Sequence, residues 1–163
     1  MKIIPAEEYY IPGIVELWKE FADFLENIDP YFARRSDGHL HFESVLKSFM
    51  RSEDHLVLIA VDAGQVAAYS ISSILQCYPM LQYDRYGEIQ DFAVKAVYRK
   101  KGIGGQMLPK IYAWFRSKEI VRIELRVAVE NKIGCSFWKK HGFKPFMHVL
   151  YLPGSPETDL SRR

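Results

Sequence analysis

Cysteine is scarce in this sequence of 163 residues, and long apolar runs are missing from it. Only Cys77 and Cys135 occur, far apart and without the spacing of a metal site, which is typical of a protein kept reduced in the cytoplasm. No apolar run approaches the length of a membrane span, and the N-terminus has no signal-peptide pattern. We therefore expect a cytoplasmic protein without a metal and without a membrane partner.

Net charge is low as well. The formal value of +2 is too small to indicate nucleic-acid binding, and basic residues cluster only locally, at Arg99–Lys101 and Lys139-Lys140. Hydrophobic residues make up 48% and charged residues 26%, which describes an ordinary globular protein. This length fits a single domain over residues 1–163, with Pro153–Arg163 as a polar, flexible tail.

Apolar spacing predicts that helices and strands alternate along the chain. The predicted order, β-α-α-β-β-β-α-β-α-β, indicates an α/β fold with a mixed, mostly antiparallel central sheet and helices on both faces. Strands are expected at Met1–Ile4, Leu56–Val61, Val66–Leu75, Glu88–Val94, Ile120–Val129 and Phe143–Leu152. Helices are expected from about Pro12 to Leu25, over His41–Arg51, from the glycine-rich turn described next to about Ser117, and over Asn131–His141.

The stretch Ile89–Gly105 is the most informative one, because a strand there runs into a basic, glycine-rich turn and then into a helix. The turn reads Arg99-Lys100-Lys101-Gly102-Ile103-Gly104-Gly105. Unpaired N–H groups and the macrodipole at a helix start favour an anion, and glycine lets a phosphate approach the backbone. A P-loop is excluded because Gly105-Gln106 stands where lysine and a hydroxyl residue are needed. A dinucleotide fingerprint also fits poorly, because Leu108 stands where a small residue belongs.

Two motifs resemble those of one known family. Arg99-x-x-Gly102-x-Gly104, after the strand Phe92-Ala93-Val94, resembles the acetyl-CoA pyrophosphate loop of the GCN5-related N-acetyltransferases. The segment from Asn131 to Phe143 resembles the later motif of that family, Asn-x-x-Ala-x-x-Phe-Tyr followed by Gly-Phe. Asn131, Phe137, Gly142 and Phe143 match it, with Gly134 in place of alanine and Trp138 in place of tyrosine.

The resemblance implies an acetyltransferase that uses acetyl-CoA as the acetyl donor and acts on a primary amine by direct attack in a ternary complex. It implies that the backbone of Phe92, Ala93 and Val94 bonds the pantetheine, with the Val94 amide polarising the thioester. It places the diphosphate on residues 99–105 and the rest of the cofactor on Asn131 and Phe137. From the residues alone, Asn131 can also be a helix cap and Phe137 a core aromatic.

Attack on a thioester requires a neutral amine, and therefore a base. Glu88 matches the catalytic glutamate of the histone-acetylating branch, and Asp91 matches an aspartate of the polyamine-acetylating branch. Strict alternation puts the two carboxylates on opposite faces of the strand, unless a bulge intervenes. Glu88 is the preferred base, and Asp91 and a water relay are the alternatives.

The family's tyrosine is often cast as the acid for the leaving thiolate, and Trp138 cannot replace it because an indole N–H does not give up its proton near neutral pH. Tyr86, Tyr83 or water are the alternatives, or the thiolate leaves without a protein acid.

The acceptor is a small-molecule amine or a peptide or protein amine. Acidic residues near the strand (Asp84, Glu88, Asp91) favour a cationic one. The two N-terminal helices are expected to form either a wall of the acceptor site or a plain amphipathic hairpin. Because dimers are common in the family, a homodimer is one possible assembly. A noncatalytic acyl-CoA-binding sensor is the alternative function, and O-acetylation or a longer acyl donor is also compatible with the sequence.

Overall fold

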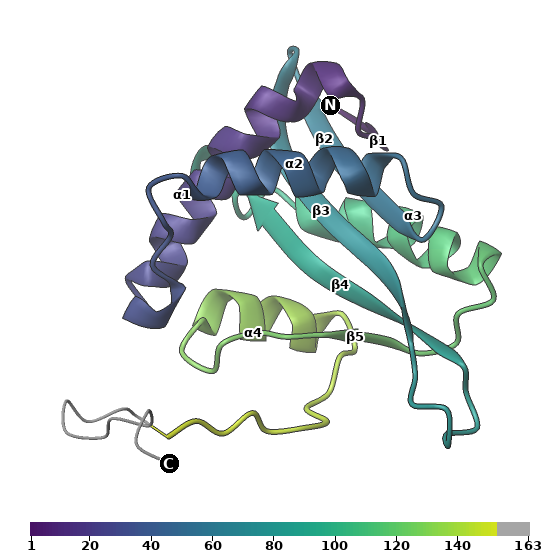
Figure 1. Ribbon diagram of the computed structural model, residues 1–163. Helices are drawn as coiled ribbons and strands as arrows, with labels where there is room; N and C mark the ends of the chain where they lie inside the picture. Colours follow the sequence, from purple (N-terminus) through teal and green to yellow (C-terminus); the bar gives the residue numbers. More distant parts are fainter. Residues whose placement is uncertain (153–163) are drawn as a thin grey trace.

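The computed structural model describes residues 1–152, so the predicted tail Pro153–Arg163 lies outside the described residues. Within them, five strands form one sheet in the order β1-β2-β3-β4-β5 (Figure 1). Neighbouring strands are antiparallel except β4 and β5, which are parallel, so the sheet is mixed and mostly antiparallel as predicted. The strands are β1 (Lys2–Pro5), β2 (His55–Asp62), β3 (Gln65–Gln76), β4 (Arg85–Val94) and β5 (Ile123–Leu125).

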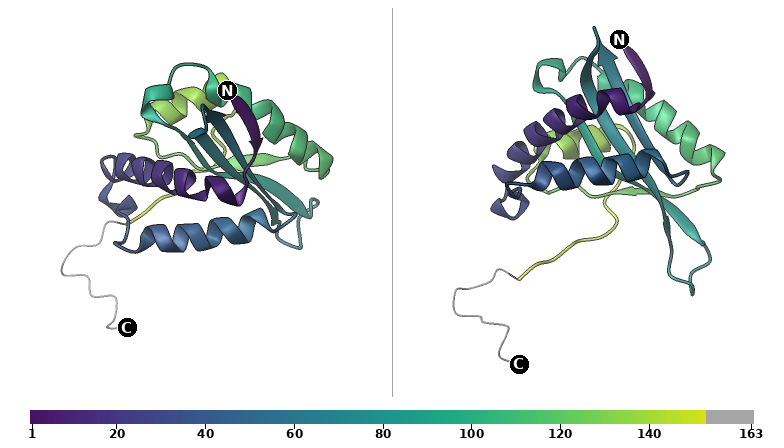
Figure 2. Two further views of the ribbon diagram at one scale, coloured as in Figure 1. Left: turned by 90° about the horizontal axis from the view of Figure 1, so that it is seen from above. Right: turned by 45° about the horizontal axis from the view of Figure 1, so that its top comes forward.

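Helices cover both faces of this sheet, which confirms the predicted architecture (Figure 2). One face carries α1 (Ile11–Glu26) and α2 (Gly38–Met50), and the other carries α3 (Ile103–Ser117) and α4 (Lys132–Lys140). Each helix lies within a few residues of its predicted range. Single 3-10 turns occur at Glu8–Tyr10, Pro30–Phe32 and Ala96–Tyr98.

Two apolar clusters fill the space between these layers. The α3 side buries Met107, Ile111 and Phe115 together with Trp138 of α4. The α1/α2 side buries a second set against the sheet, which includes Ile14, Leu17, Leu46, Ile59 and Tyr69. Helical spacing predicts these stripes because residues three and four apart share one face of a helix. No helix in the described part of the chain is long and apolar enough to span a membrane.

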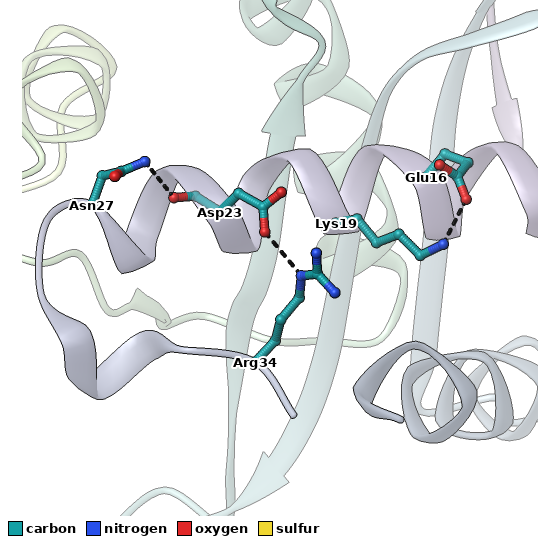
Figure 3. Close-up of polar contacts among 5 residues, drawn as sticks. All are labelled: Glu16, Lys19, Asp23, Asn27 and Arg34. Atoms are coloured by element: carbon teal, nitrogen blue, oxygen red, sulfur yellow. Dashed lines mark hydrogen bonds and ion pairs between the residues drawn. The ribbon is translucent and has the colours of Figure 1, made fainter. Parts of the chain in front are cut away.

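The outer face of α1 carries ion pairs instead of apolar side chains (Figure 3). Lys19 contacts Glu16 at 2.8 Å, and Arg34 Nε donates to Asp23 at 2.9 Å. The Asn27 side chain donates to the Asp23 carbonyl oxygen at 2.8 Å. Since Arg34 belongs to the connection between α1 and α2, its pair with Asp23 holds that connection against the helix.

The predictions for the last two strands are wrong. Only Ile123–Leu125 of the predicted strand Ile120–Val129 is in the sheet, because β5 pairs with β4 over three residues and with no other strand in residues 1–152. The predicted strand Phe143–Leu152 does not form within the described part of the chain. An alternating or apolar pattern makes a strand only where a neighbouring backbone completes its hydrogen bonds, and here that neighbour is missing.

We expect Gly87→Ala to lower the free energy of unfolding by about 3 kcal/mol, because overpacking of a core costs roughly 1–3 kcal/mol and this site has no free space. A Cβ at Gly87 of β4 would lie less than 3.0 Å from three ring carbons of Phe115, a fully buried residue of α3. Urea unfolding followed by circular dichroism measures the change. Gly38→Ala is the matched control, since its Cβ would meet nothing closer than Trp18 at 3.4 Å. Equal stability of the Gly87 variant and the wild type would contradict this packing.

Candidate active site around strand β4

A β-bulge interrupts β4 in its middle. Ser72 of β3 pairs with Ile89, while the preceding residue, Ile71, pairs with Asp91. Gln90 is therefore the extra residue on β4. A bulge of this kind shifts the alternation of side chains between the two faces of a sheet.

The bulge places Glu88 and Asp91 on the same face of the sheet. Glu88 pairs with Ser73 and Asp91 pairs with Ile71, and these two β3 residues share a face because they are two apart. Ile71 belongs to the cluster under α1 and α2, which identifies the face. Strict alternation would put the two carboxylates on opposite faces of the sheet. The bulge shifts the alternation by one residue, so they share a face.

The two carboxylates have different surroundings. The Glu88 side chain is 14% exposed and contacts Arg126 Nε at 3.6 Å, with Arg126 itself largely in solvent. Next to it, Ser73 Oγ donates to Gln90 Oε1 at 2.8 Å. Glu88 thus remains within reach of water and of a bound molecule at the edge of the α1/α2 face.

Burial raises the pKa of Asp91 from the ordinary 3.8 to about 7. The nearby Tyr69 hydroxyl opposes this shift and lowers the pKa of Asp91 in part. The hydroxyl itself is buried and makes no hydrogen bond with any described residue. Burial and then the charge of Asp91 raise the pKa of Tyr69 well above its usual range. A carboxyl with a pKa near 7 exchanges protons readily at neutral pH.

Beyond the bulge, β4 separates from β5. Parallel pairing ends at Ile89 and Leu125, so residues 90–94 have no strand beside them on that side among the described residues (Figure 1). On the β3 side, the Lys95 N–H donates to the Ala67 carbonyl at 2.9 Å. Because bonded and non-bonded pairs alternate in an antiparallel ladder, the N–H groups of Phe92 and Val94 point away from β3. The backbone of these residues therefore faces the gap beside β5, as the resemblance implies.

The glycine-rich turn lies at the far end of β4 and begins α3. Lys100 and Gly102 have positive φ values of 61° and 77°, which turn the chain sharply into the helix. The Gln106 N–H donates to the Gly102 carbonyl at 3.1 Å and makes the first bond of α3. The N–H groups just before it, at residues 103–105, belong to the open first turn of the helix, where an anion can accept from them.

Two of the glycines are also constrained by packing. A Cβ on Gly104 would lie 3.0 Å from Phe137 and 3.2 Å from Phe92, and one on Gly105 would lie 3.3 Å from His141. Phe92 belongs to β4, Phe137 belongs to α4 and His141 directly follows α4, so the glycines allow the start of α3 to approach these elements. The space they leave serves packing as well as access to the backbone.

The Arg99 side chain turns toward α1. Its Nε donates to the Val94 carbonyl at 3.0 Å, and one of its terminal nitrogens lies 3.7 Å from Glu20. Its guanidinium carbon also lies 5.4 Å from the centre of the Phe24 ring. Glu20 in turn accepts the Ala96 N–H at 2.8 Å. The Arg99 side chain therefore joins the turn to α1, while its backbone stays in the turn.

In the structure, Asn131 caps a helix and Phe137 packs against other aromatic rings, which are the two roles that the sequence alone allows for them. The Asn131 side chain accepts the Gly134 N–H at 2.9 Å and caps α4, and Phe137 packs 5.5 Å from Phe92, between ring centres. A Cβ on Gly134 would lie 2.7 Å from the Asn131 side chain and 3.0 Å from Val127. Glycine therefore replaces the alanine of the family pattern because this helix start is too crowded for a side chain.

The candidates for the acid are separated by the fold. Trp138 is a core residue, 8% exposed, and its ring packs edge-on against Phe92 and Phe143. Tyr83 is exposed in the connection between β3 and β4, whereas Tyr86 shares the face of Glu88, two residues along β4. Burial and then the charge of Glu88 raise the pKa of Tyr86.

A separate groove of about 750 Å³ lies between α1 and the turn that joins β2 to β3. Its lining includes Tyr9, Glu16, Gly64 and Lys95, and none of the predicted site residues. It borders the site only through Glu20, which it shares with the Arg99 contact.

Comparison with known proteins identifies the class of this chain. Residues 12–143 match the Acetyltransferase (GNAT) family, so the chain belongs to that family and the predicted resemblance is confirmed. Streptothricin acetyltransferase A of Bacillus subtilis (strain 168) is 34% identical over 61 residues, which are 37% of this chain and 35% of that protein. The chain thus matches about a third of this relative's length.

Two solved structures show the same fold. The tetramutant of the BH1408 protein from Bacillus halodurans superposes with a TM-score of 0.85 at 22% identity, over 94% of this chain and 99% of that one. The aminoglycoside N-acetyltransferase AAC(6')-Iy in complex with CoA superposes with a TM-score of 0.71 at 15% identity, over 94% and 99%.

The sequence analysis missed Glu20 and Tyr69. Glu20 lies on the polar side of a helix, and nothing local shows that it meets a turn 76 residues later. A role for Tyr69 was only weakly indicated by the sequence. A tyrosine in an otherwise apolar strand is expected to be buried, and its buried hydroxyl then needs a polar neighbour.

We expect Asp91→Asn to stabilise the protein at neutral pH, and by less as the pH falls. Because the pKa of Asp91 is about 7 in the folded protein and 3.8 in the unfolded chain, its protonation stabilises the fold fully below pH 3.8. That stabilisation is lost as the pH rises through about 7. Asparagine does not ionise and is not subject to this loss. The free energy of unfolding of the variant, relative to that of the wild type, should therefore rise by roughly 2–4 kcal/mol from pH 4 to pH 8. Urea unfolding of both proteins at several pH values gives the difference. A difference that is independent of pH would contradict the burial of this carboxyl.

Proposed function

We propose that this protein is an acetyl-CoA-dependent N-acetyltransferase that transfers an acetyl group to a primary amine by direct attack in a ternary complex. The observation that carries the proposal is that the outward N–H groups of Phe92 and Val94, which have no strand beside them, lead along the chain to the open helix start at residues 103–105. An extended ligand can bond the strand edge with its amide groups and place an anionic end at the helix. Acetyl-CoA, with amides in its pantetheine arm and a diphosphate beyond them, has both parts.

In this proposal each part of the site has one task. The N–H groups at the start of α3 donate to the diphosphate oxygens, and Lys100 and Lys101 add positive charge beside them. Arg99 holds the turn in place through the Val94 carbonyl and Glu20, and its side chain does not need to touch the phosphates. Phe92 and Phe137 form the apolar wall on the α4 side.

The reaction forms a bond between the amine nitrogen and the thioester carbon, and breaks the bond between that carbon and sulfur. The Val94 N–H, which points into the gap, donates to the oxygen that becomes negative during attack. A base takes the proton that the amine releases. The thiolate leaves as an anion and is protonated by water or by Tyr86, while buried Trp138 contributes packing only.

We assign the base role to Glu88, with Asp91 and a water relay as the alternatives. Glu88 faces the α1/α2 side and keeps contact with solvent, so an acceptor amine can reach it directly or through one water. Asp91 lies on the same face. With a pKa of about 7, it can take a proton passed on from the edge.

A small cationic amine is the proposed acceptor. Glu88 and Asp91 make this face of β4 acidic, and an acidic site favours positively charged molecules. The relatives reported above carry the names of streptothricin and aminoglycoside acetyltransferases, which fits the same class of acceptor.

Release of thiol from acetyl-CoA in the presence of an amine panel tests the activity. The panel holds streptothricin, several aminoglycosides, a polyamine and a short peptide with a free N-terminus. Saturable release with at least one small cationic amine is expected. Saturable CoA binding without turnover on any amine would instead identify a noncatalytic sensor, and turnover on the peptide alone would overturn the acceptor class.

We expect Lys101→Glu to weaken CoA binding by about tenfold, because it reverses a charge beside the proposed diphosphate site. Lys110→Glu makes the same change two turns further along α3 and serves as the control. Isothermal titration with CoA at low and high salt measures both. Equal effects of the two variants would place the diphosphate elsewhere.

For Glu88→Gln, kcat should fall by on the order of 100-fold while KM for acetyl-CoA changes less than about twofold, since general-base catalysis contributes roughly 10²–10⁴. Steady-state rates between pH 6 and pH 9 measure this. Glu124→Gln, the change opposite Glu88 on β5, controls for loss of a nearby charge. If Asp91→Asn lowers kcat and Glu88→Gln does not, the base is Asp91.

A further inference from the structure

Gln90, the extra residue of the β4 bulge, carries its amide on the same face of the sheet as the two carboxylates. Its Oε1 accepts a hydrogen bond from Ser73 Oγ at 2.8 Å. Ile74 belongs to the apolar cluster under α3, so the preceding residue, Ser73, points to the opposite face of the sheet. The Gln90 amide therefore lies on the α1/α2 face, and along β4 it stands between Glu88 and Asp91.

The contact with Ser73 determines which end of this amide is free. Ser73 is fully buried, so its hydroxyl needs a partner within the protein, and the Gln90 oxygen is that partner. The amide nitrogen is bonded to the same carbon as that oxygen and points away from Ser73. Because Gln90 is an exposed residue, its two N–H donors face outward, toward a molecule bound on this face.

Amide donors in this position discriminate between amines. The neighbouring carboxylates attract an ammonium group, but the amide N–H groups cannot donate to it, because an ammonium group has only donors of its own. A hydroxyl or ether oxygen close to the reacting amine can accept from the amide. A plain alkyl amine offers no such acceptor and leaves both N–H groups to water.

We infer that Gln90 is a specificity-determining residue, which selects amines that carry a hydroxyl or ether oxygen near the reacting nitrogen over plain alkyl amines. The inference rests on the proposed function, because it needs an acceptor amine bound beside Glu88. Ser73 is a positioning residue in this arrangement, since it holds the amide by its oxygen and touches no substrate. Gln90 takes no part in proton transfer, because a side-chain amide does not ionise.

Three small amines of equal length test this selection. Ethanolamine ends in a hydroxyl, propylamine in a methyl and ethylenediamine in a second amine. The ratio of kcat/KM for ethanolamine to kcat/KM for propylamine should be about fivefold lower in Gln90→Met than in the wild type, because a neutral hydrogen bond contributes a modest net free energy. Comparing ratios cancels the different basicities of the amines. Gln82→Met changes an exposed glutamine between β3 and β4 and is the matched control, which should leave the ratio unchanged.

Two further variants separate selection from a loss of structure. Gln90→Glu keeps one oxygen for Ser73 and presents a second oxygen in place of the N–H donors. Its ratio of kcat/KM for ethylenediamine to that for propylamine should rise about tenfold, because hydrogen bonds between charged groups are the stronger ones. Ser73→Ala releases the amide and should lower the ethanolamine preference about twofold, but it should change the ratio no further in the Gln90→Met background, because the two residues act as one unit.

The outcomes distinguish this inference from the proposed function. Thiol release whose selectivity is the same in the wild type, Gln90→Met and Gln90→Glu would overturn the role of Gln90 and leave the acetyltransferase intact. No thiol release with these amines or with the panel above would overturn both. NMR of the Gln90 side-chain amide in the CoA complex gives a second measurement that does not need turnover. Its N–H signals should shift with ethanolamine and not with propylamine, and equal shifts or none with both amines would overturn the inference.

Discussion

Parallel pairing between β4 and β5 lasts for only three residues, from Gly87 to Ile89, and the organisation of the site depends on that limit. Because β5 ends there, the outward N–H groups of Phe92 and Val94 have no strand partner, whereas the Val94 carbonyl accepts from Arg99. Buried backbone groups without partners are costly, so a strand that leaves them open can bond another molecule there. The glycine-rich turn follows at the end of the same strand. A ligand can therefore make the backbone hydrogen bonds to this part of β4 that β5 does not make.

The bulge at Gln90 adds a second constraint. It turns Glu88 and Asp91 to one face of the sheet, although they are three residues apart. For Asp91, burial raises the pKa from the ordinary 3.8 to about 7. The buried one is destabilising when it is ionised, and such a cost is common where a fold retains a group for function rather than for stability.

Much of the fold could be predicted from the sequence, because helices and buried strands carry their own periodicity. The positions of α1, α2 and α4 follow from apolar stripes, and the turn before α3 follows from its glycines and basic residues. Features that depend on a distant partner could not be predicted. The bulge depends on how β3 and β4 fit together, and the contact of Arg99 with Glu20 joins elements that are remote in sequence. The predicted strands 120–129 and 143–152 have correct local patterns, but a strand also needs a neighbour, and a pattern does not show where that neighbour comes from.

The contacts of Glu20 limit how the molecule can move. This one carboxylate holds the Ala96 N–H and the Arg99 side chain, and Arg99 also holds the carbonyl at the end of β4. These contacts consequently join the second half of α1 to the glycine-rich turn and to the last residue of β4. A displacement of the turn by more than the slack of a hydrogen bond must either carry α1 along or break these contacts. Under the proposed function, a shift of the diphosphate-binding turn is therefore passed on to α1, which covers the face of β4 that carries Glu88 and Asp91.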